Sequence, residues 1–332
     1  MDSYEQIITR TPLRISFLGG GTDINSFYKK YGGSIFSSAI NKFVYVTVKK
    51  HSKFYNEKFR LNYSKSENVN IRENIKNKII KECLKITKID FPLYISTVSD
   101  IPAGSGLGGS SAFVVGLLKS LNTLIGKKLS EKELYFQSKK VEGIINKKIV
   151  GIQDLFPACF GGINYYKILK HGSVKILKIK KKKIYKNLNK NIKLYWTGQT
   201  RLASKIIKPN NYNVSSKKKY LKEIMKLSDN YYFSNLKNDN FNLKELGLVL
   251  SKSWDLKKKI SKKIDIPASK KIINYANLYG AKGSKLCGAG GGGFALVIGS
   301  QKTFKKLDDK LGKARSININ LHNSSSEVIS KL

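Results

Sequence analysis

Residues 100–112 read Asp100-Ile-Pro-Ala-Gly-Ser-Gly-Leu-Gly-Gly-Ser-Ser-Ala112. The alternating residues Leu93, Ile95 and Thr97 predict a strand that enters this segment, and the apolar run after it predicts a helix over 110–125. Glycines allow backbone N–H groups to turn inward, and the start of a helix adds partial positive charge. The segment therefore predicts a cradle for a phosphate group.

The glycine spacing alone is compatible with more than one kind of loop. Gly104, Gly106 and Gly109 match the dinucleotide fingerprint, which also requires an acidic residue about 20 positions later, at the end of a second strand. The acids nearest that spacing, Glu131 and Glu133, instead lie in a capping box that opens the next helix. The fingerprint is therefore a weak alternative, and a glycine-rich turn without a ligand is another.

A Walker A loop does not fit, because it requires a lysine directly before a serine or threonine, and no lysine follows these glycines. Ser110 and Ser111 begin the predicted helix, so a hydroxyl group can reach a magnesium ion there. We therefore interpret the segment as a cradle for a nucleoside triphosphate that lacks the Walker lysine.

Three glycine segments together resemble the GHMP kinases, the superfamily of galactokinase, homoserine kinase, mevalonate kinase and phosphomevalonate kinase. Pro102-Ala-Gly-Ser-Gly-Leu-Gly-Gly-Ser-Ser-Ala112 is similar to their second motif, with one additional glycine before the serines. Thr11-Pro-Leu-Arg-Ile-Ser-Phe-Leu-Gly-Gly-Gly-Thr-Asp23 resembles the first motif, and Lys285-Leu-Cys-Gly-Ala-Gly-Gly-Gly-Gly-Phe294 resembles the third. In this order the three motifs span nearly the whole chain, which makes the resemblance specific.

The fold expected from the pattern is α+β, because strands and helices alternate irregularly with mostly antiparallel pairing signals. The resemblance implies two domains with the site in the cleft between them. It implies a ribosomal protein S5 domain 2-like fold for residues 1–180, with the ATP cradle and the catalytic residues. It implies a ferredoxin-like fold for residues 181–332, whose glycine loop 288–293 closes on the site.

Further segments are similar to one branch, the D-glycero-D-manno-heptose 7-phosphate kinases. They are Gly19-Gly-Gly-Thr-Asp23, Gly151-Ile-Gln-Asp154 followed by Phe160-Gly-Gly162, Thr197-Gly-Gln-Thr-Arg201 and Ser253-Trp-Asp-Leu-Lys-Lys258. The resemblance implies ATP-dependent phosphorylation of the anomeric C1 hydroxyl of that sugar phosphate, for nucleotide-activated heptose and surface polysaccharide. A fucose or galactose 1-kinase is the alternative within the superfamily, and a basic nucleic-acid-binding protein with an S5-like domain is the alternative from another class.

Within the resemblance, Asp154 matches the family's aspartate, and a carboxylate there would accept or orient the proton of the sugar hydroxyl. Arg14 stands where relatives carry lysine or arginine, and it would face both Asp154 and the γ-phosphate. Phosphoryl transfer depends mainly on positioning and charge neutralisation, so both are predicted as catalytic. The simpler alternatives are a helix N-cap for Asp154 and a structural ion pair for Arg14.

The resemblance also implies a magnesium ion held by Ser111 and Glu142, while several waters stay on the ion. The alternative for Glu142 is an ordinary charge on a helix surface. For Asp23, which would accept hydrogen bonds from sugar hydroxyls, the alternative is a turn in a loop.

Two larger groups of residues are predicted to bind ligands. The cradle for ATP comprises Pro102, Gly104, Ser105, Gly106, Leu107, Gly108, Gly109, Ser110 and Ser111. The sugar site comprises Gly20, Gly21, Thr22, Asp23, Asp154, Gly290, Gly291 and Arg201, where a guanidinium could hold a distal phosphate in a bidentate manner.

The formal net charge of +41 invites a nucleic-acid-binding interpretation. Only six of the 63 basic residues are arginine, however. Arginine is the residue that recognises guanine edges and binds phosphates with two parallel hydrogen bonds. Lysine is spread over the chain with Asn, Ile and Tyr, as an AT-rich genome would produce. We therefore expect no specific nucleic-acid partner, and we predict a solvated strand edge and loop for the lysine run 178–193.

Cys83, Cys159 and Cys287 are far apart and odd in number, which fits neither a disulfide framework nor a zinc cluster. We find no secretory leader and no apolar run of the ~20 residues that a bilayer span requires. The expectation is a cytoplasmic protein without a membrane partner, and a homodimer is compatible with it.

Several elements are predicted from pattern alone. Residues 35–50 predict a pair of strands, and residues 52–64 predict a hairpin that turns at Asn56-Glu57. Helices are expected over 217–236, 244–262 and 268–279. Leu155-Phe156-Pro157 and Ser284 depart from the residues that the resemblance implies, and they could alter contacts with the substrate.

Overall fold

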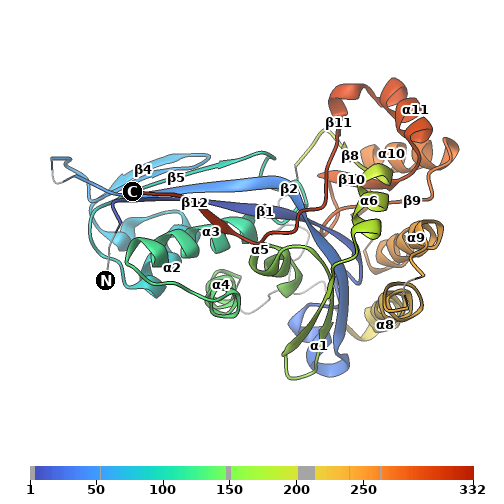
Figure 1. The fold of residues 1–332 in the computed structure, drawn as a ribbon, viewed down its shortest axis with the longest axis horizontal. Helices are drawn as coiled ribbons and strands as arrows, with labels where there is room; N and C mark the ends of the chain where they lie inside the picture. Colours follow the sequence, from blue (N-terminus) through green and yellow to red (C-terminus); the bar gives the residue numbers. More distant parts are fainter. Residues whose placement is uncertain (1–3, 53, 147–150, 201–213, 239, 262–263) are drawn as a thin grey trace.

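A computed structural model describes residues 4–52, 54–146, 151–200, 214–238, 240–261 and 264–332. Its strands form two sheets with helices packed against them, and one large hydrophobic core cluster contains residues from both sheets (Figure 1). The strand pairs are antiparallel except for β3 and β5, which are parallel. The predicted α+β class is confirmed.

The first sheet has eight strands and carries the first glycine segment at the end of its strand β1. The strand order is β12-β1-β2-β5-β3-β4, and β6 pairs with both β2 and β7. The strands are β1 (Gln6–Leu18), β2 (Gly33–Lys50), β3 (Phe59–Asn62), β4 (Ser66–Val69), β5 (Leu93–Ser99), β6 (Ile163–Ile168), β7 (Val174–Ile179) and β12 (Glu327–Lys331).

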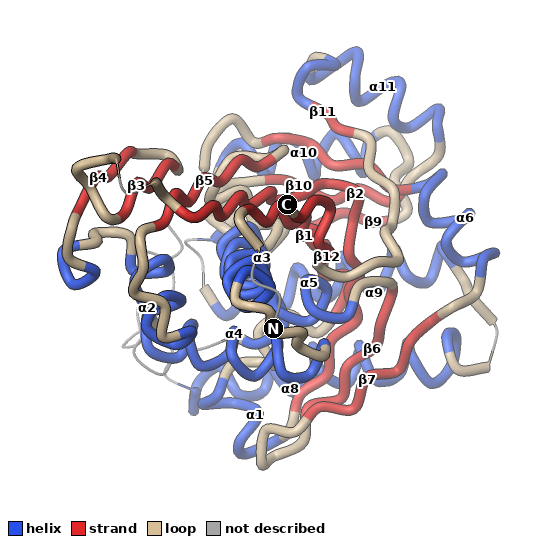
Figure 2. The backbone as a smooth tube through the Cα atoms, turned by 60° about the vertical axis from the view of Figure 1, so that its left-hand side comes forward, coloured by secondary structure: helices blue, strands red, loops and turns tan. Residues whose placement is uncertain are grey.

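Four helices lie on one face of this sheet in both views, with α3 in the middle (Figures 1 and 2). They are α2 (Lys78–Thr87), α3 (Gly109–Leu124), α4 (Glu131–Ile145) and α5 (Leu155–Phe160). Helix α3 is apolar on most sides because it packs on β1, β2, α2, α4 and α5 at once. The predicted capping box is present at the start of α4, where Ser130 and Glu133 cap each other.

The second sheet has four strands in the order β11-β8-β10-β9. They are β8 (Ile192–Trp196), β9 (Gly283–Leu286), β10 (Phe294–Ile298) and β11 (Ser316–Ile317). Helix α10 packs on β9 and β10, whereas α9 packs on β9 and against α8. The remaining helices and turns are α1 (Asn25–Tyr31), α8 (Val214–Tyr231), α9 (Leu243–Ile260), α10 (Pro267–Leu278), α11 (Gln301–Leu311), and the short η1 (Arg72–Asn74), η2 (Ile152–Asp154), η4 (Tyr232–Leu236) and η6 (Lys313–Arg315).

Two predicted strand arrangements are wrong. Residues 35–50 do not form a pair of strands, because they belong to the single strand β2. This strand pairs with β1 along its length, and the pairing register shifts near Pro12 and Ser16, as at a β-bulge. The predicted hairpin over 52–64 lies later in the chain, where β3 pairs with β4 around a turn at residues 63–65. Glu57, which we expected in the turn, instead binds Arg60 at 2.5 Å.

The lysine run is also different from the prediction, because most of it is helical. Helix α6 (Lys182–Asn191) follows β7 directly. Ile184 and Leu188, one helical turn apart, are buried against the core, while the neighbouring lysines are exposed. The two apolar residues at this spacing carry the helical signal, and the abundance of lysine hid it.

The chain crosses between the two sheets more than once. After β11 it returns to the first sheet as β12, which pairs with the outer edge of β1. Helix α8 likewise contacts β1 and β2. The boundary predicted at residues 180 and 181 falls between β7 and α6, and it stays a prediction. Within the described part of the chain, no helix is both long and apolar enough to span a membrane.

Candidate active site

The predicted cradle connects β5 to α3. Gly104, Gly106 and Gly108 have φ angles of +75°, +84° and +80°, a region that side chains disfavour. Gly108 is also the N-cap of α3, and no side chain caps that helix start. The first turn therefore presents uncapped N–H groups beside a glycine loop, which is the local geometry that suits an anionic phosphate.

The third glycine segment packs directly on this cradle. Phe294 donates its backbone N–H to Ser105 O at 3.0 Å. A Cβ atom on Gly293 would lie 2.1 Å from the same carbonyl, and one on Gly106 would lie 2.8 Å from Cys287 O. Glycine is thus required at both positions, because any side chain would force the two segments apart.

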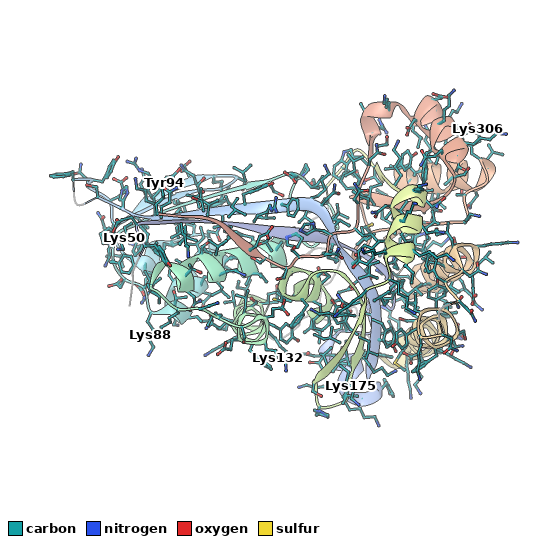
Figure 3. All side chains as sticks on the ribbon, viewed as in Figure 1. Lys50, Lys88, Tyr94, Lys132, Lys175 and Lys306 are labelled. Carbon is teal, nitrogen blue, oxygen red and sulfur yellow. The ribbon has the colours of Figure 1, made fainter. Side chains whose placement is uncertain are left out.

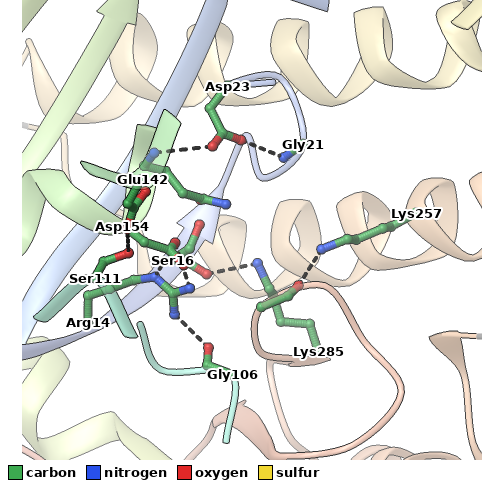
Figure 4. A network of polar contacts seen from close by, with 12 residues as sticks. Arg14, Ser16, Gly21, Asp23, Gly106, Ser111, Glu142, Asp154, Lys257 and Lys285 are labelled. Carbon is green, nitrogen blue, oxygen red and sulfur yellow. Dashed lines mark hydrogen bonds and ion pairs between the residues drawn. The ribbon is translucent and has the colours of Figure 1, made fainter. Parts of the chain in front are cut away.

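Arg14 joins the cradle to Asp154. Its Nε and Nη2 atoms donate to Asp154 Oδ1 at 2.9 and 2.7 Å, and its Nη1 donates to Gly106 O at 2.6 Å (Figure 4). The guanidinium is only 2% exposed, whereas the Asp154 side chain is 28% exposed. One oxygen of the carboxylate is therefore bound by a buried cation, while the side chain stays partly accessible.

Asp154 ends η2 and is the N-cap residue of α5, but its side chain makes no capping hydrogen bond there. The carboxylate points to Arg14 instead. This geometry argues against the simpler alternative of a plain helix cap.

Ser111 and Glu142 meet beside this pair. The Ser111 hydroxyl donates to Glu142 Oε1, and both residues are buried. The pKa of Glu142 is raised to about 8, mainly by burial and in smaller part by the charges of Asp154 and Asp23. A carboxyl group in this position is not the surface charge of the simpler alternative.

The pair fits a magnesium ion, which usually takes one or two protein oxygens and fills its other positions with water and phosphate oxygens. Among the described residues, no cluster of three or more His, Cys, Asp or Glu side chains gathers as a metal site. A metal held mainly by protein carboxylates is therefore not indicated, and Ser111 with Glu142 would hold only one edge of a hydrated ion.

Asp23 is buried, and the backbone N–H groups of Gly21 and Gln153 each donate to it at 3.1 Å. Burial raises its pKa, and the charge of Asp154 adds to that effect. The first glycine segment and the Asp154 segment are therefore tied together by one carboxyl group (Figure 4). The Thr22 hydroxyl makes hydrogen bonds with backbone atoms of Gly19 and Ser34, and its role in sugar binding stays a prediction.

Two other predicted sugar residues, both in the third glycine segment, lie beside Ile264. A Cβ on Gly290 would meet the side chain of Ile264, and Gly291 donates its N–H to Ile264 O at 2.8 Å. Arg201 lies outside the described residues. The role of all three in sugar binding stays a prediction.

Sequence reasoning gave no role to Lys285, which is the first residue of the third glycine segment. Its Nζ donates to Ser16 O at 2.8 Å and to Phe17 O at 3.0 Å, and the side chain is buried. Its pKa is lowered to about 8, mainly by burial and in smaller part by the charge of Arg14. The available signal was its place at the start of the third motif. Lys257 of α9 contacts the same segment through Gly288 O at 2.5 Å.

The departures from the resemblance lie in the core. Phe156 is fully buried and stacks on Tyr166 with ring centroids 4.3 Å apart. Leu155 and Pro157 are buried beside it, and Ser284 N–H donates to Ser251 Oγ at 3.1 Å. Whether they alter contacts with the substrate stays a prediction. Trp254 is buried in the second core cluster.

A glycine cradle at a helix start, beside an arginine-held carboxylate, is the arrangement of a phosphotransferase that acts on an alcohol group. Known proteins agree with it. Residues 71–162 match the family model described as GHMP kinases N terminal domain, and residues 233–316 match GHMP kinases C terminal.

The D-glycero-alpha-D-manno-heptose 7-phosphate kinase of Campylobacter jejuni subsp. jejuni serotype O:2 is 30% identical over 317 residues, which cover 88% of this chain and 89% of that protein. The mevalonate kinase of Methanocaldococcus jannaschii is 27% identical over 228 residues, 68% of this chain and 67% of that one. A solved structure described as a D-glycero-D-manno-heptose 1-phosphate kinase from Bacteriodes thetaiotaomicron superposes with a TM-score of 0.77 at 22% identity, covering 98% of this chain and 99% of that chain.

The chain belongs to the GHMP kinases. It is a sugar kinase of that superfamily that uses ATP as phosphate donor and an alcohol group as acceptor.

Proposed function

We propose that the protein phosphorylates the anomeric C1 hydroxyl of D-glycero-D-manno-heptose 7-phosphate and forms the 1,7-bisphosphate, for nucleotide-activated heptose and surface polysaccharide. The 30% identity to a heptose 7-phosphate kinase over most of both chains supports the sugar. The observation that carries the reaction is the contact of Arg14 with both Asp154 and Gly106, since it places the proposed base beside the cradle.

In the proposed reaction the C1 hydroxyl oxygen attacks the γ-phosphorus of ATP. The bond from that phosphorus to the β–γ bridging oxygen breaks, and ADP leaves. Asp154 accepts the hydroxyl proton, and Arg14 orients this carboxylate and offsets negative charge near the transferred group. Ser111 and Glu142 would hold magnesium, which supplies charge neutralisation on the phosphates.

Fucose or galactose 1-phosphorylation remains the alternative within the family. The retained pattern Gly151-Ile-Gln-Asp154 supports the heptose branch.

The alternative of a nucleic-acid-binding protein gains no support from the distribution of charge. The labelled lysines Lys50, Lys88, Lys132, Lys175 and Lys306 lie at opposite ends and edges of the molecule in Figure 3. We expect nonspecific binding to RNA or DNA to vanish between about 50 and 200 mM salt, as purely electrostatic contacts do. Sequence-specific binding in a fluorescence anisotropy assay at the higher salt would contradict this.

The test of the proposed function is a panel of sugars and sugar phosphates with ATP and magnesium. ADP release identifies the substrate, and ³¹P NMR of the product identifies the phosphorylated carbon. Heptose 7-phosphate should give the highest kcat/KM and an anomeric phosphate. A higher kcat/KM on fucose or galactose, or a phosphate on another carbon, would overturn the proposal.

A further inference from the structure

A cavity lies at the end of helix α3 that is farther from the cradle. Its volume is about 650 Å³, which is the size of pockets that hold small molecules. Helix α3 begins at the cradle and has 16 residues, so at 1.5 Å per residue its two ends are about 24 Å apart. The cavity is therefore separate from the site described above.

Segments far apart in the sequence line this cavity. They are the last turns of α3, the loop 126–129 that follows it, and the strand β12, together with Tyr4 and Leu134. Strand β12 lies beside α3, as Figure 2 shows. Because these segments belong to the folded core of the first sheet and its helices, the cavity has a defined shape in the folded protein.

The charge of the lining has a single sign. Four lining residues are lysines, and no lining residue is Asp or Glu. The lysines are Lys119, Lys127, Lys128 and Lys331. Lysine is common over the whole chain, so the number of lysines alone is weak evidence for a ligand. The burial of Lys119 is the feature that distinguishes this cavity from the rest of the basic surface.

The ammonium group of Lys119 is half-buried without an anionic partner. Its Nζ donates to Ser326 O at 2.5 Å, and no described carboxylate lies within ion-pair distance of it. Glu327 acts on Lys119 only from farther away, and its own partner is Arg10. Burial lowers the pKa of Lys119, because the ammonium group is partly removed from water. An ammonium group has three donors, so an anion in the cavity would supply both the opposite charge and further acceptors.

Apolar side chains line the cavity beside the lysines. They come from Leu129, Leu134, Val328 and Ile329, and the Ile329 residue is 47% exposed. A simple inorganic ion would leave this surface in water, whereas an organic anion would cover part of it. The lining therefore fits a ligand that has both a charged and an apolar part.

We propose that this cavity binds a small organic anion, whose phosphate or carboxylate group contacts Lys119, Lys127 and Lys128 and whose apolar part covers Ile329. The site goes beyond the kinase reaction, because it lies at the other end of α3 from the ATP cradle. It does not depend on which sugar is the acceptor. Lys331 is directed to Tyr4, with Nζ 5.3 Å from the ring centroid, and closes the cavity at one side.

Isothermal titration calorimetry with phenyl phosphate tests the site. A non-hydrolysable ATP analogue with magnesium first fills the cradle, and about 150 mM salt screens nonspecific attraction to the basic surface. Phenyl phosphate should bind once per chain and more tightly than inorganic phosphate, which lacks the apolar part. Benzoate in the same assay shows whether the cavity prefers a carboxylate or a phosphate group.

Variants of the lining locate the binding. Lys119→Met keeps the hydrocarbon stem and removes the ammonium group, while Lys127→Gln with Lys128→Gln changes only exposed residues and therefore does not endanger the fold. Each should weaken binding of phenyl phosphate by about 10- to 100-fold. Lys306→Gln, at an exposed position of α11, is the matched control and should leave the binding unchanged.

Ile329→Thr tests the apolar part of the ligand. It should weaken binding of phenyl phosphate by about threefold or more and leave binding of inorganic phosphate unchanged. Melting temperatures close to wild type, and ATP turnover within about twofold of wild type without phenyl phosphate, would confirm that the variants are folded.

Three results would overturn the proposal. They are the absence of saturable binding to the wild type, equal affinities for phenyl phosphate and inorganic phosphate, and binding that the cavity variants leave unchanged. The last result would place phenyl phosphate in the acceptor site or over the basic surface. None of these results bears on the proposed sugar kinase reaction, because the titration measures no turnover.

Discussion

The two sides of the site differ in the atoms that make their contacts: side chains on one side, and mostly backbone atoms on the other. On one side, side chains from β1, α3, α4 and the start of α5 pair with each other, as in Arg14–Asp154 and Ser111–Glu142. On the other side, the third glycine segment makes its contacts through backbone atoms, and Lys285 also binds backbone carbonyls. The first side can carry protons and charge, whereas the second sets spacing. The two sides should therefore fail in different ways when mutated.

The largest effect is expected on the side with paired side chains. The double variant Ser111→Ala with Glu142→Gln removes both proposed magnesium ligands, so magnesium-dependent turnover should be lost. A magnesium titration of ATP-dependent ADP release measures this. Glu133→Gln, on the same helix α4 but in its capping box, is the matched control and should keep activity. Wild-type turnover in the double variant would show that these residues are not required as magnesium ligands.

Asp154→Asn tests the base on the same side. It keeps the size of the residue but cannot accept a proton, so kcat should fall by about 10²–10⁴-fold while KM for ATP changes little. Asp255→Asn, which removes an exposed carboxylate paired with Lys258, is the control and should leave kcat unchanged. If kcat of the Asp154 variant stays within about threefold of wild type, transfer relies on positioning alone.

Gly293→Ala tests the side made of backbone. Its φ of +94° and the 2.1 Å approach to Ser105 O mean that a methyl group must separate the two glycine segments. We expect KM for ATP to rise about tenfold and the melting temperature to fall by several degrees. Gly312→Ala is the matched control, because its φ is +91° but no atom lies within 4 Å of the added Cβ. Equal effects in both variants would mean that backbone strain, and not the close approach, matters.

The smallest effect concerns the pH dependence of stability. Lys285 has a pKa of about 8 in the folded protein against 10.5 ordinarily, so above pH 8 the unfolded chain binds more protons than the folded one. Its contribution to the free energy of unfolding should therefore rise between about pH 8 and 10.5, by on the order of 3 kcal/mol at most. Urea unfolding of wild type and Lys285→Met at pH 7.5, 9 and 10 measures the difference. Parallel pH profiles for the two proteins would contradict a lowered pKa of Lys285 in the folded protein.

The sequence was most informative where the backbone conformation requires glycine. The cradle and the third segment could be located because glycine runs at strand and helix ends have few structural explanations. The pairs Arg14–Asp154 and Ser111–Glu142 were placed together through the resemblance, not through spacing. Their separations of 140 and 31 residues give no local signal.

Other features depend on tertiary contacts that pattern does not reveal. Lys285 binds carbonyls 268 and 269 residues away. Helix α6 was missed because two apolar residues among many lysines are a weak periodic signal.

The pairing of β12 with β1 has a consequence for synthesis on the ribosome. The outer edge of β1 cannot be covered until residues 327–331 have been made, roughly 15–60 seconds after β1 at ordinary elongation rates. An uncovered strand edge invites intermolecular pairing during that time, and a charged side chain on the edge opposes it. Arg10 provides such a charge on β1, and when β12 arrives its Nε donates to Glu327 Oε1 at 3.0 Å. The same arginine would thus oppose aggregation of the nascent chain and then stabilise the pairing of β12 with β1.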